Sequence, residues 1–262
     1  MIKIYNKNVG YVHFPDGTVK LELPVNQGEN TIVWLYENDA ELVYLQFLVK
    51  HIRSKSPNSK LFLDMPYIPN ARMDRVKSPE EVFTLKWFAE IINDLKFDNV
   101  FVQDAHSNVS LALINNVVES QPVRENLNLL KTYTNFDILF YPDEGAAKKY
   151  ADILGTEYGF GIKHRDWKTG AITNYEVVAN DVSGKNVLIV DDICSKGGTF
   201  LHAGNALKKL GAASVYLWVT HCENSIYDGE LLKENSPIEK IYTTGDILNC
   251  SQTNEKIVVL GF

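Results

Sequence analysis

The chain has 262 residues, 45% of them hydrophobic, and a formal net charge of −7. This length fits one large domain or two of ordinary size, and the apolar fraction is normal for a globular protein. The acidic balance argues against a general nucleic-acid or lipid-surface binder, since both need a basic excess. No apolar run approaches the roughly 20 residues of a membrane span. Three widely spaced cysteines and a start without an apolar signal core indicate a cytoplasmic protein.

Strand-like and helical patterns alternate through the first half of the chain. The predicted strands are 31–36, 60–65 and 99–103, and the predicted helices are 40–54 and 80–95. Ser78-Pro79-Glu80-Glu81 is typical of a helix start, with proline in the first turn. Alternation of this kind predicts an α/β fold with a mainly parallel sheet.

The second half of the chain shows the same alternation of strand-like and helical patterns. The predicted strands are 138–141, 186–190, 215–220 and 256–260, and the predicted helices are 144–154 and 198–210. A polar stretch, Glu125–Asn135, separates two strand patterns and indicates a domain boundary. We therefore predict an N-terminal domain of residues 1–134 and a C-terminal domain of residues 135–262.

The strongest local signal is an apolar strand that is followed by two carboxylates, Asp191 and Asp192, then by a short loop and a helix. The loop is Ser195-Lys196-Gly197-Gly198-Thr199. Glycines let backbone N–H groups approach a phosphate, and a helix N-terminus adds positive potential. Carboxylates beside such a loop bind something other than phosphate, and sugar hydroxyls or a hydrated Mg²⁺ fit. An acidic surface turn is the alternative, and the attached glycine loop favours the functional interpretation.

This segment resembles the ribose-phosphate motif of type I phosphoribosyltransferases and ribose-phosphate pyrophosphokinases. Further segments, in family order, resemble the pyrophosphokinases. They are Phe14-Pro15-Asp16-Gly17, Tyr67 to Arg75 with Ala71-Arg72-Met73-Asp74-Arg75, Gln103-Asp104-Ala105-His106-Ser107, Tyr141-Pro142-Asp143-Glu144-Gly145-Ala146, Lys163-His164-Arg165 and Thr220-His221. Each match is weak alone, and the ordered set, over roughly residues 10 to 225, is specific.

The resemblance implies two tandem Rossmann-like domains of the phosphoribosyltransferase type. It implies Mg²⁺-dependent transfer of pyrophosphate from ATP to the anomeric hydroxyl of ribose 5-phosphate, which gives phosphoribosyl pyrophosphate and AMP. It also implies a homo-oligomer, a dimer or a hexamer, with no nucleic-acid or membrane partner.

The resemblance also implies roles for particular residues. Lys163 and Arg165 become catalytic cations on an arm that closes over ATP, with Lys163 to Gly170 as its flap. The loop from Ser195 to Thr199, with Asp191 and Asp192, becomes the ribose-phosphate site. His106 and Asp143 become ligands of one Mg²⁺. The ATP-binding residues are Phe14, Asp16, Arg72, Asp74, Arg75 and His106.

Several departures from the family pattern cluster at the expected ligand pockets and leave the acceptor open. Ser195-Lys196 replaces the usual Asp-Thr/Ser, Thr18 replaces a glutamate, and Met73 replaces a glutamine. One alternative acceptor is therefore the ribose 5-phosphate unit of ADP-ribose. A phosphoribosyltransferase that consumes phosphoribosyl pyrophosphate and a non-catalytic partner of a pyrophosphokinase are further alternatives.

Overall fold

The computed structural model describes residues 1–23, 29–155, 157–165, 172–249 and 254–260. The chain divides into two compact units, Met1–Ser120 and Gln121–Phe262. The sequence placed the division after residue 134. The stretch between the two divisions is helix α4 (Pro122–Tyr133), and its Val123 and Leu130 are buried in the core of the second unit. A polar, amphipathic helix therefore lies where the sequence suggested a boundary segment.

The first unit is built on a six-stranded sheet with the order β2-β1-β5-β6-β7-β8. The strands are β1 (Ile2–Ile4), β2 (Lys7–Asn8), β5 (Asn30–Trp34), β6 (Leu61–Asp64), β7 (Asn99–Gln103) and β8 (Val117–Ser120). The last four run parallel, and β1 and β2 form an antiparallel edge. The helices are α1 (Ala40–Lys55), α2 (Thr84–Asp94) and α3 (Asn108–Leu113).

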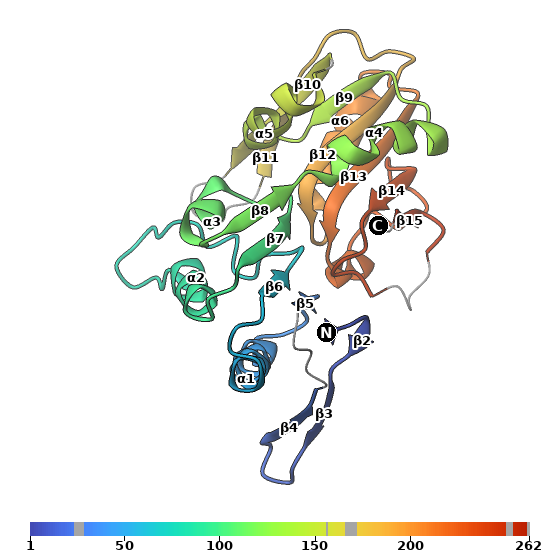
Figure 1. Ribbon diagram of the computed structural model, residues 1–262. Coiled ribbons are helices and arrows are strands. Elements are labelled where there is room, and N and C mark those ends of the chain that lie inside the picture. The colour runs from blue at the N-terminus through green and yellow to red at the C-terminus, as the bar shows by residue number, and fades with distance from the viewer. Residues whose placement is uncertain (24–28, 156, 166–171, 250–253, 261–262) are drawn as a thin grey trace. The chain divides into compact units, whose positions relative to one another are not determined.

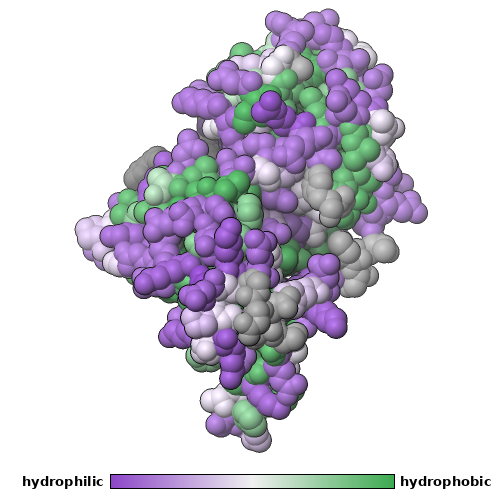
Figure 2. Space-filling model, viewed as in Figure 1, coloured by the Kyte–Doolittle hydropathy of each residue, from purple (hydrophilic) through white to green (hydrophobic). Residues whose placement is uncertain are grey.

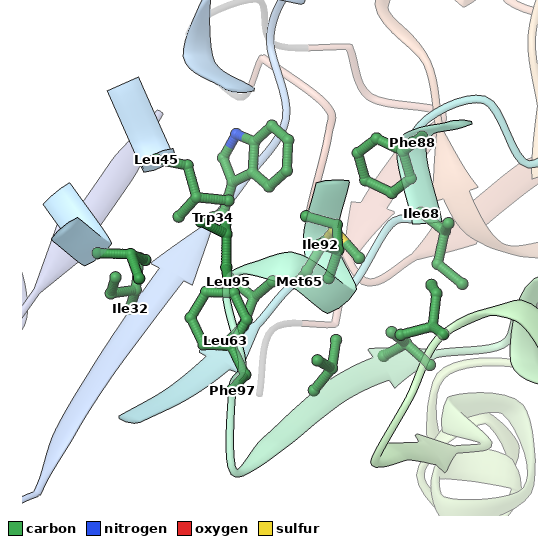
Figure 3. Close-up of a cluster of buried hydrophobic side chains, with 14 of the residues drawn as sticks. Ile32, Trp34, Leu45, Leu63, Met65, Ile68, Phe88, Ile92, Leu95 and Phe97 are labelled. Atoms are coloured by element: carbon green, nitrogen blue, oxygen red, sulfur yellow. The ribbon is translucent and has the colours of Figure 1, made fainter. Parts of the chain in front are cut away.

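The core of this unit lies between the sheet and helices α1 and α2 (Figure 3). Alternate strand residues such as Ile32 and Trp34 point to one face, as the two-residue period of a strand requires. The Trp34 ring centroid lies 6.1 Å from that of Phe88 on α2, and its indole N–H donates to the buried Glu41 carboxylate at 2.9 Å. The one polar atom of this large side chain is thereby satisfied.

The predicted start of the second helix at Glu80 is wrong, because α2 begins at Thr84. Residues 78–81 instead form a turn, in which Glu81 N–H donates to the Ser78 carbonyl at 3.2 Å and the Glu81 carboxylate accepts from Lys77 N–H at 2.6 Å. Val82 is 61% exposed, and the buried stripe begins only at Leu85. The cap-like residues therefore stabilise a local turn, and the apolar stripe decides where the helix begins.

A separate hairpin, β3 (Gly10–His13) and β4 (Val19–Glu22), extends away from the six-stranded sheet (Figure 1). It is attached to α1 through Tyr44, whose hydroxyl lies 2.9 Å from His13 Nε2 and whose ring lies 5.3 Å from that of Tyr11. Several of its apolar residues are exposed, and Figure 2 shows them at the foot of the view.

The second unit contains a seven-stranded sheet with the order β11-β10-β9-β12-β13-β14-β15. The strands are β9 (Ile138–Tyr141), β10 (Tyr158–Arg165), β11 (Ile172–Val178), β12 (Asn186–Cys194), β13 (Ser214–Cys222), β14 (Lys240–Thr243) and β15 (Ile257–Val259). Only the β10–β11 pair among these is antiparallel. The helices are α4, α5 (Glu144–Leu154), α6 (Gly198–Lys209) and the 3₁₀ helix η1 (Asn224–Asp228).

Helices cover both faces of this sheet. On one face Phe200 and Leu207 of α6 pack with Ile189 and Leu217. On the other face Leu130 of α4 and Tyr150 of α5 pack with the strand residues Leu188 and Trp218. Burial on both faces explains the nearly continuous apolar sequence of β12 and β13.

The predicted fold class, an α/β protein with mainly parallel sheets in two sheet-containing units, is confirmed. The strands β12 and β13 reach further than predicted, because they stay paired as far as Cys194 and Cys222. In the described part of the chain, no helix is both long and apolar enough to cross a bilayer.

Candidate active site

The side chains expected to bind the sugar phosphate gather at one edge of the sheet in the second unit. Strands β9 and β12 are parallel neighbours, with Leu139 opposite Leu188. Asp143 follows β9, and the loop from Ser195 to Thr199 follows β12. The carboxyl ends of neighbouring parallel strands are where open α/β sheets bind ligands.

Asp143 makes two different interactions through its two carboxylate oxygens. Oδ1 accepts the Ala146 N–H at 2.9 Å and caps helix α5, and Oδ2 lies 2.8 Å from Lys163 Nζ. Burial favours the neutral acid, but the hydrogen bonds from Lys163 and Ala146 outweigh it, so the pKa of Asp143 is lowered. Asp143 is therefore a carboxylate that already holds one cation.

Lys163 lies on β10, which pairs with β9, and its side chain is only 11% exposed. The structure thus brings Lys163 and Asp143 together, a pairing that the sequence did not predict. Arg165 is the last residue of β10. Residues 166–170 of the expected flap lie outside the described residues.

Asp191 and Asp192 belong to the extended strand β12, and this corrects the expectation that they follow the strand. Asp192 lies 3.5 Å from Lys149 Nζ of α5. Burial, then the nearby carboxylates of Asp192 and Asp143, raise the pKa of Asp191 well above its usual value. Lys149 is a further cation at this edge of the sheet, and no sequence motif indicated it.

The loop between β12 and α6 has the form of an anion site. Gly197 is the N-cap residue of the 12-residue helix α6 and has a φ of +80°, a conformation that favours glycine. Because glycine has no side chain to cap the helix, the first-turn N–H groups face outward from the helix end. Gly198 has open space around its Cα, and Lys196 is exposed.

A segment after β13 supports this loop from behind. A Cβ added to Gly197 would lie 2.2 Å from a methyl carbon of Leu231, and one added to Gly229 would lie 2.1 Å from the Lys196 carbonyl oxygen. The hydroxyls of Ser195 and Ser225 are 2.9 Å apart. No motif indicated Ser225, Gly229 or Leu231, because these residues act only through packing against the loop.

The late Thr220-His221 pair lies just before Cys222, the last residue of strand β13, and is buried. His221 Nδ1 lies 2.5 Å from Asp246 Oδ2, and the Thr244 hydroxyl donates to the Thr220 carbonyl at 2.7 Å. The pair therefore joins the end of β13 to the turn after β14. These bonds stabilise the backbone beside the candidate site.

The residues expected on the ATP side belong to the first unit. Arg72, Asp74 and Arg75 lie in the segment after β6, and His106 is exposed in the segment after β7. Backbone bonds join the two segments, since Gln103 N–H donates to the Pro66 carbonyl at 2.9 Å. Arg75 is 80% exposed and lies 3.8 Å from Asp74. The fold thus places these residues in the segments that follow two neighbouring parallel strands, β6 and β7.

Phe14 and Asp16 lie apart from this group, on the turn of the β3–β4 hairpin. Phe14 is 52% exposed. Asp16 accepts bonds from Thr18 N–H at 3.0 Å and from the Thr18 hydroxyl at 2.7 Å, and these bonds lower the pKa of Asp16. The residue that departs from the family pattern, Thr18, therefore orders the turn that presents Phe14.

Comparison with known proteins places this geometry in a family. Residues 146–258 match the phosphoribosyl transferase domain. The ribose-phosphate pyrophosphokinase of Pyrococcus furiosus is 32% identical over 92% of this chain and 91% of its own length. That of Pyrococcus abyssi is 30% identical over 92% of this chain and 84% of its own. The chain belongs to the ribose-phosphate pyrophosphokinase family.

The fold agrees with this membership. The crystal structure of phosphoribosylpyrophosphate synthetase from Mycobacterium smegmatis superposes with a TM-score of 0.75 at 19% identity, over 97% of this chain and 86% of that one. As a member of the ribose-phosphate pyrophosphokinase family, the protein is an enzyme of the diphosphotransferase type. The roles of its individual residues stay predictions.

The raised pKa of Asp191 makes its charge costly to the ligand-free fold. Because the folded pKa lies above the ordinary value of 3.8, the contribution of this carboxyl to stability is complete below that pH and is lost as the pH rises through the folded pKa. Asp191→Asn, which keeps the shape without the charge, should therefore raise the melting temperature at pH 8 by roughly 2 °C or more, with little gain at pH 4.

Calorimetric melts at both pH values measure this effect, with Asp152→Asn on the exposed side of α5 as the matched control. A difference between Asp191→Asn and the parent protein that is independent of pH would contradict the burial of a disfavoured charge.

Proposed function

We propose that this enzyme transfers the diphosphoryl group of ATP to the anomeric hydroxyl of ribose 5-phosphate, giving phosphoribosyl pyrophosphate and AMP. The observation that carries the proposal is the arrangement at the end of β12, where two carboxylates precede a helix with glycine at its N-cap. Lys163 stands on β10, which is separated from β12 by β9. Membership of the pyrophosphokinase family supports the same reaction.

The sugar phosphate would bind along the strand end and the loop. The outward N–H groups at the start of α6, with the hydroxyl of Thr199, suit a phosphate monoester. Carboxylate oxygens accept hydrogen bonds from sugar hydroxyls, so Asp191 and Asp192 would hold the vicinal diol. Lys196, exposed beside the loop, adds a cation for the phosphate.

The transfer requires charge neutralisation more than acid or base strength. The anomeric oxygen of the ribose bonds to the β-phosphorus of ATP, the bond from that phosphorus to the α–β bridging oxygen breaks, and AMP leaves with the bridging oxygen. The hydroxyl proton passes to solvent or to a carboxylate. Lys163 and Arg165 would stabilise the negative charge that develops on the phosphate oxygens.

The first unit would supply the nucleotide side. The segments after β6 and β7 carry the cations Arg72 and Arg75 with Asp74 and His106, which suit a polyphosphate. The exposed ring of Phe14, with Asp16 in the same turn, suits stacking on a purine. Its place on a projecting hairpin fits a homo-oligomer in which one copy contributes Phe14 to another.

Asp143 and His106 would hold the Mg²⁺ that accompanies ATP. An ammonium already stands at Asp143 Oδ2, so this carboxylate accepts a cation. In the described residues, no three His, Cys, Asp or Glu side chains cluster as a metal site. A site of few protein ligands fits Mg²⁺, which keeps several waters and takes phosphate oxygens. When bound, the ion would neutralise phosphate charge.

The reaction is tested by incubating the protein with ATP, Mg²⁺ and ribose 5-phosphate and measuring AMP. Lys163→Ala and Arg165→Ala should each lower kcat by about a hundredfold, the usual scale for one charge-stabilising group. ATP binding, measured by calorimetry, should persist. Phosphoribosyl transfer to a base without AMP release would instead identify a phosphoribosyltransferase, and absence of both reactions would indicate a non-catalytic partner.

The acceptor is tested by comparing kcat/KM for ribose 5-phosphate and for ADP-ribose at fixed ATP. We expect ribose 5-phosphate to be preferred, because the helix end of α6 suits the two charges of a terminal phosphate. A preference for ADP-ribose of about tenfold or more, which is about 1.4 kcal/mol, would reassign the acceptor. Asp191→Asn and Asp192→Asn should impair both acceptors, since both carry the diol.

If Asp143 is a metal ligand, replacement of Lys163 should strengthen metal binding and lower turnover. Lys163→Gln removes the ammonium that competes at Asp143, so the substrate-free protein should bind Mn²⁺, a probe for Mg²⁺, about three- to fivefold more tightly. Turnover should nevertheless fall. Electron paramagnetic resonance of free Mn²⁺ measures the affinity, with Lys148→Gln on the exposed face of α5 as control. Unchanged or weaker Mn²⁺ binding would show that Asp143 is not a ligand.

A further inference from the structure

The β10–β11 hairpin is fastened to the end of β9 by a residue that no motif contains. Tyr175 of β11 lies directly opposite Lys163 of β10 in the antiparallel register. Its hydroxyl donates a hydrogen bond of 2.9 Å to the carbonyl of Pro142. Pro142 is the residue between the last residue of β9 and Asp143. The side chain of Tyr175 therefore crosses from the hairpin to the backbone next to Asp143.

Gly161 makes this crossing possible. A Cβ added at Gly161 would lie 2.1 Å from the Tyr175 hydroxyl oxygen, 2.4 Å from Cζ of the same ring and 2.8 Å from the Pro142 carbonyl oxygen. All three distances are shorter than real Cβ contacts. Residues 161 and 163 share one face of β10, and the Tyr175 ring reaches diagonally across that face. The glycine and the tyrosine therefore depend on each other.

The hydroxyl of Tyr175 stands among charges of the site. Burial, then the carboxylates of Asp143 and Asp191, raise the pKa of Tyr175. The phenol consequently stays protonated at working pH and remains a hydrogen-bond donor. Two residues further along β10, Lys163 Nζ donates to Asp143 Oδ2 at 2.8 Å. Beyond the backbone pairing that ends at Phe160 and Tyr141, the hairpin thus contacts the end of β9 through two side chains, a neutral donor and a cation.

We propose that Tyr175 is a positioning residue, which holds the hairpin on Pro142 so that Lys163 and Asp143 keep their relative positions. The kinetic consequence rests on the proposed function, whereas the geometry does not. The ion pair alone fixes the hairpin poorly, because the Asp143 side chain is 40% exposed and Lys163 is a flexible side chain. A shift of about 1 Å in a catalytic cation is enough to cost two orders of magnitude in rate.

Tyr175→Phe tests the proposal because it removes the donor and keeps the ring. We expect kcat to fall about five- to tenfold, the scale of one hydrogen bond, with KM for both substrates within about twofold of the parent value. Tyr133→Phe, at the exposed end of α4, is the matched control and should leave kcat unchanged. Unchanged kcat in Tyr175→Phe, or a loss seen equally in Tyr133→Phe, would overturn the role.

Gly161→Ala supplies an independent variant. The added methyl displaces the phenol, so the loss in kcat should be at least as large as that in Tyr175→Phe. In a Tyr175→Ala background the ring is absent, and the same methyl should cost clearly less. Additive losses would show that Gly161 and Tyr175 act separately. Gly10→Ala, where an added Cβ meets open space, controls for glycine replacement in a strand.

Hydrogen–deuterium exchange in the ligand-free protein separates this proposal from the proposed function. Tyr175→Phe should speed the exchange of backbone amides in residues 158–163, and Tyr133→Phe should not. If the parent protein lacks pyrophosphokinase turnover but exchange still rises in Tyr175→Phe, the proposed function is wrong. The inference that Tyr175 holds the hairpin on Pro142 then still stands. If turnover is present and neither exchange nor kcat responds to Tyr175→Phe, the positioning role of Tyr175 is wrong and the proposed function stands.

Discussion

The two-sided engagement of the Asp143 carboxylate is the interaction on which the site in the second unit depends. One oxygen caps α5 through Ala146 N–H, and the other holds Lys163 Nζ. The cap fixes the start of the helix, and the ion pair adds to the backbone pairing and the Tyr175 hydrogen bond that hold β10 at the end of β9. A single side chain therefore connects a strand end, a helix and the strand β10 that carries Lys163. The same carboxylate stays half-exposed and so accessible to a ligand.

The electrostatics of this edge are unusual for a protein that would bind polyphosphates. Asp143, Asp191 and Asp192 lie close enough to influence one another, and the whole chain carries a net charge of −7. Two lysines, Lys149 and Lys163, reach two of these carboxylates. Each carboxylate thus has a separate partner or a raised pKa, which limits repulsion in the ligand-free state. Phosphate would instead meet backbone N–H groups at the α6 end, where the potential is positive.

Glycines carry much of the precision of the site, each for a different reason. Gly197 takes a left-handed conformation against Leu231, and Gly161 leaves room for the Tyr175 ring. Gly229 allows the segment after η1 to approach the Lys196 carbonyl. A sequence motif can reveal a hydroxyl or a charged side chain, whereas these close approaches depend on the backbone and side chains that surround the motif. These close approaches therefore determine the positions of the loop between β12 and α6 and of Lys163.

The sequence by itself determined the α/β class, most of the parallel strands and the residues of the β12–α6 loop, because alternating apolar patterns and glycine-rich turns are local properties. It also located β9 and α5 with the observed bounds. It misplaced the start of α2, since a local turn at Ser78 imitates a helix cap while burial begins only at Leu85. It missed α4 as a helix of the second unit, because that helix is stabilised by packing against distant strands. Tertiary structure alone decided that Lys163 meets Asp143, that Lys149 meets Asp192, and that Tyr175 reaches Pro142. Those partners are 20, 43 and 33 residues apart in sequence, and only the pairing of strands and the packing of α5 on the sheet bring them within hydrogen-bond distance.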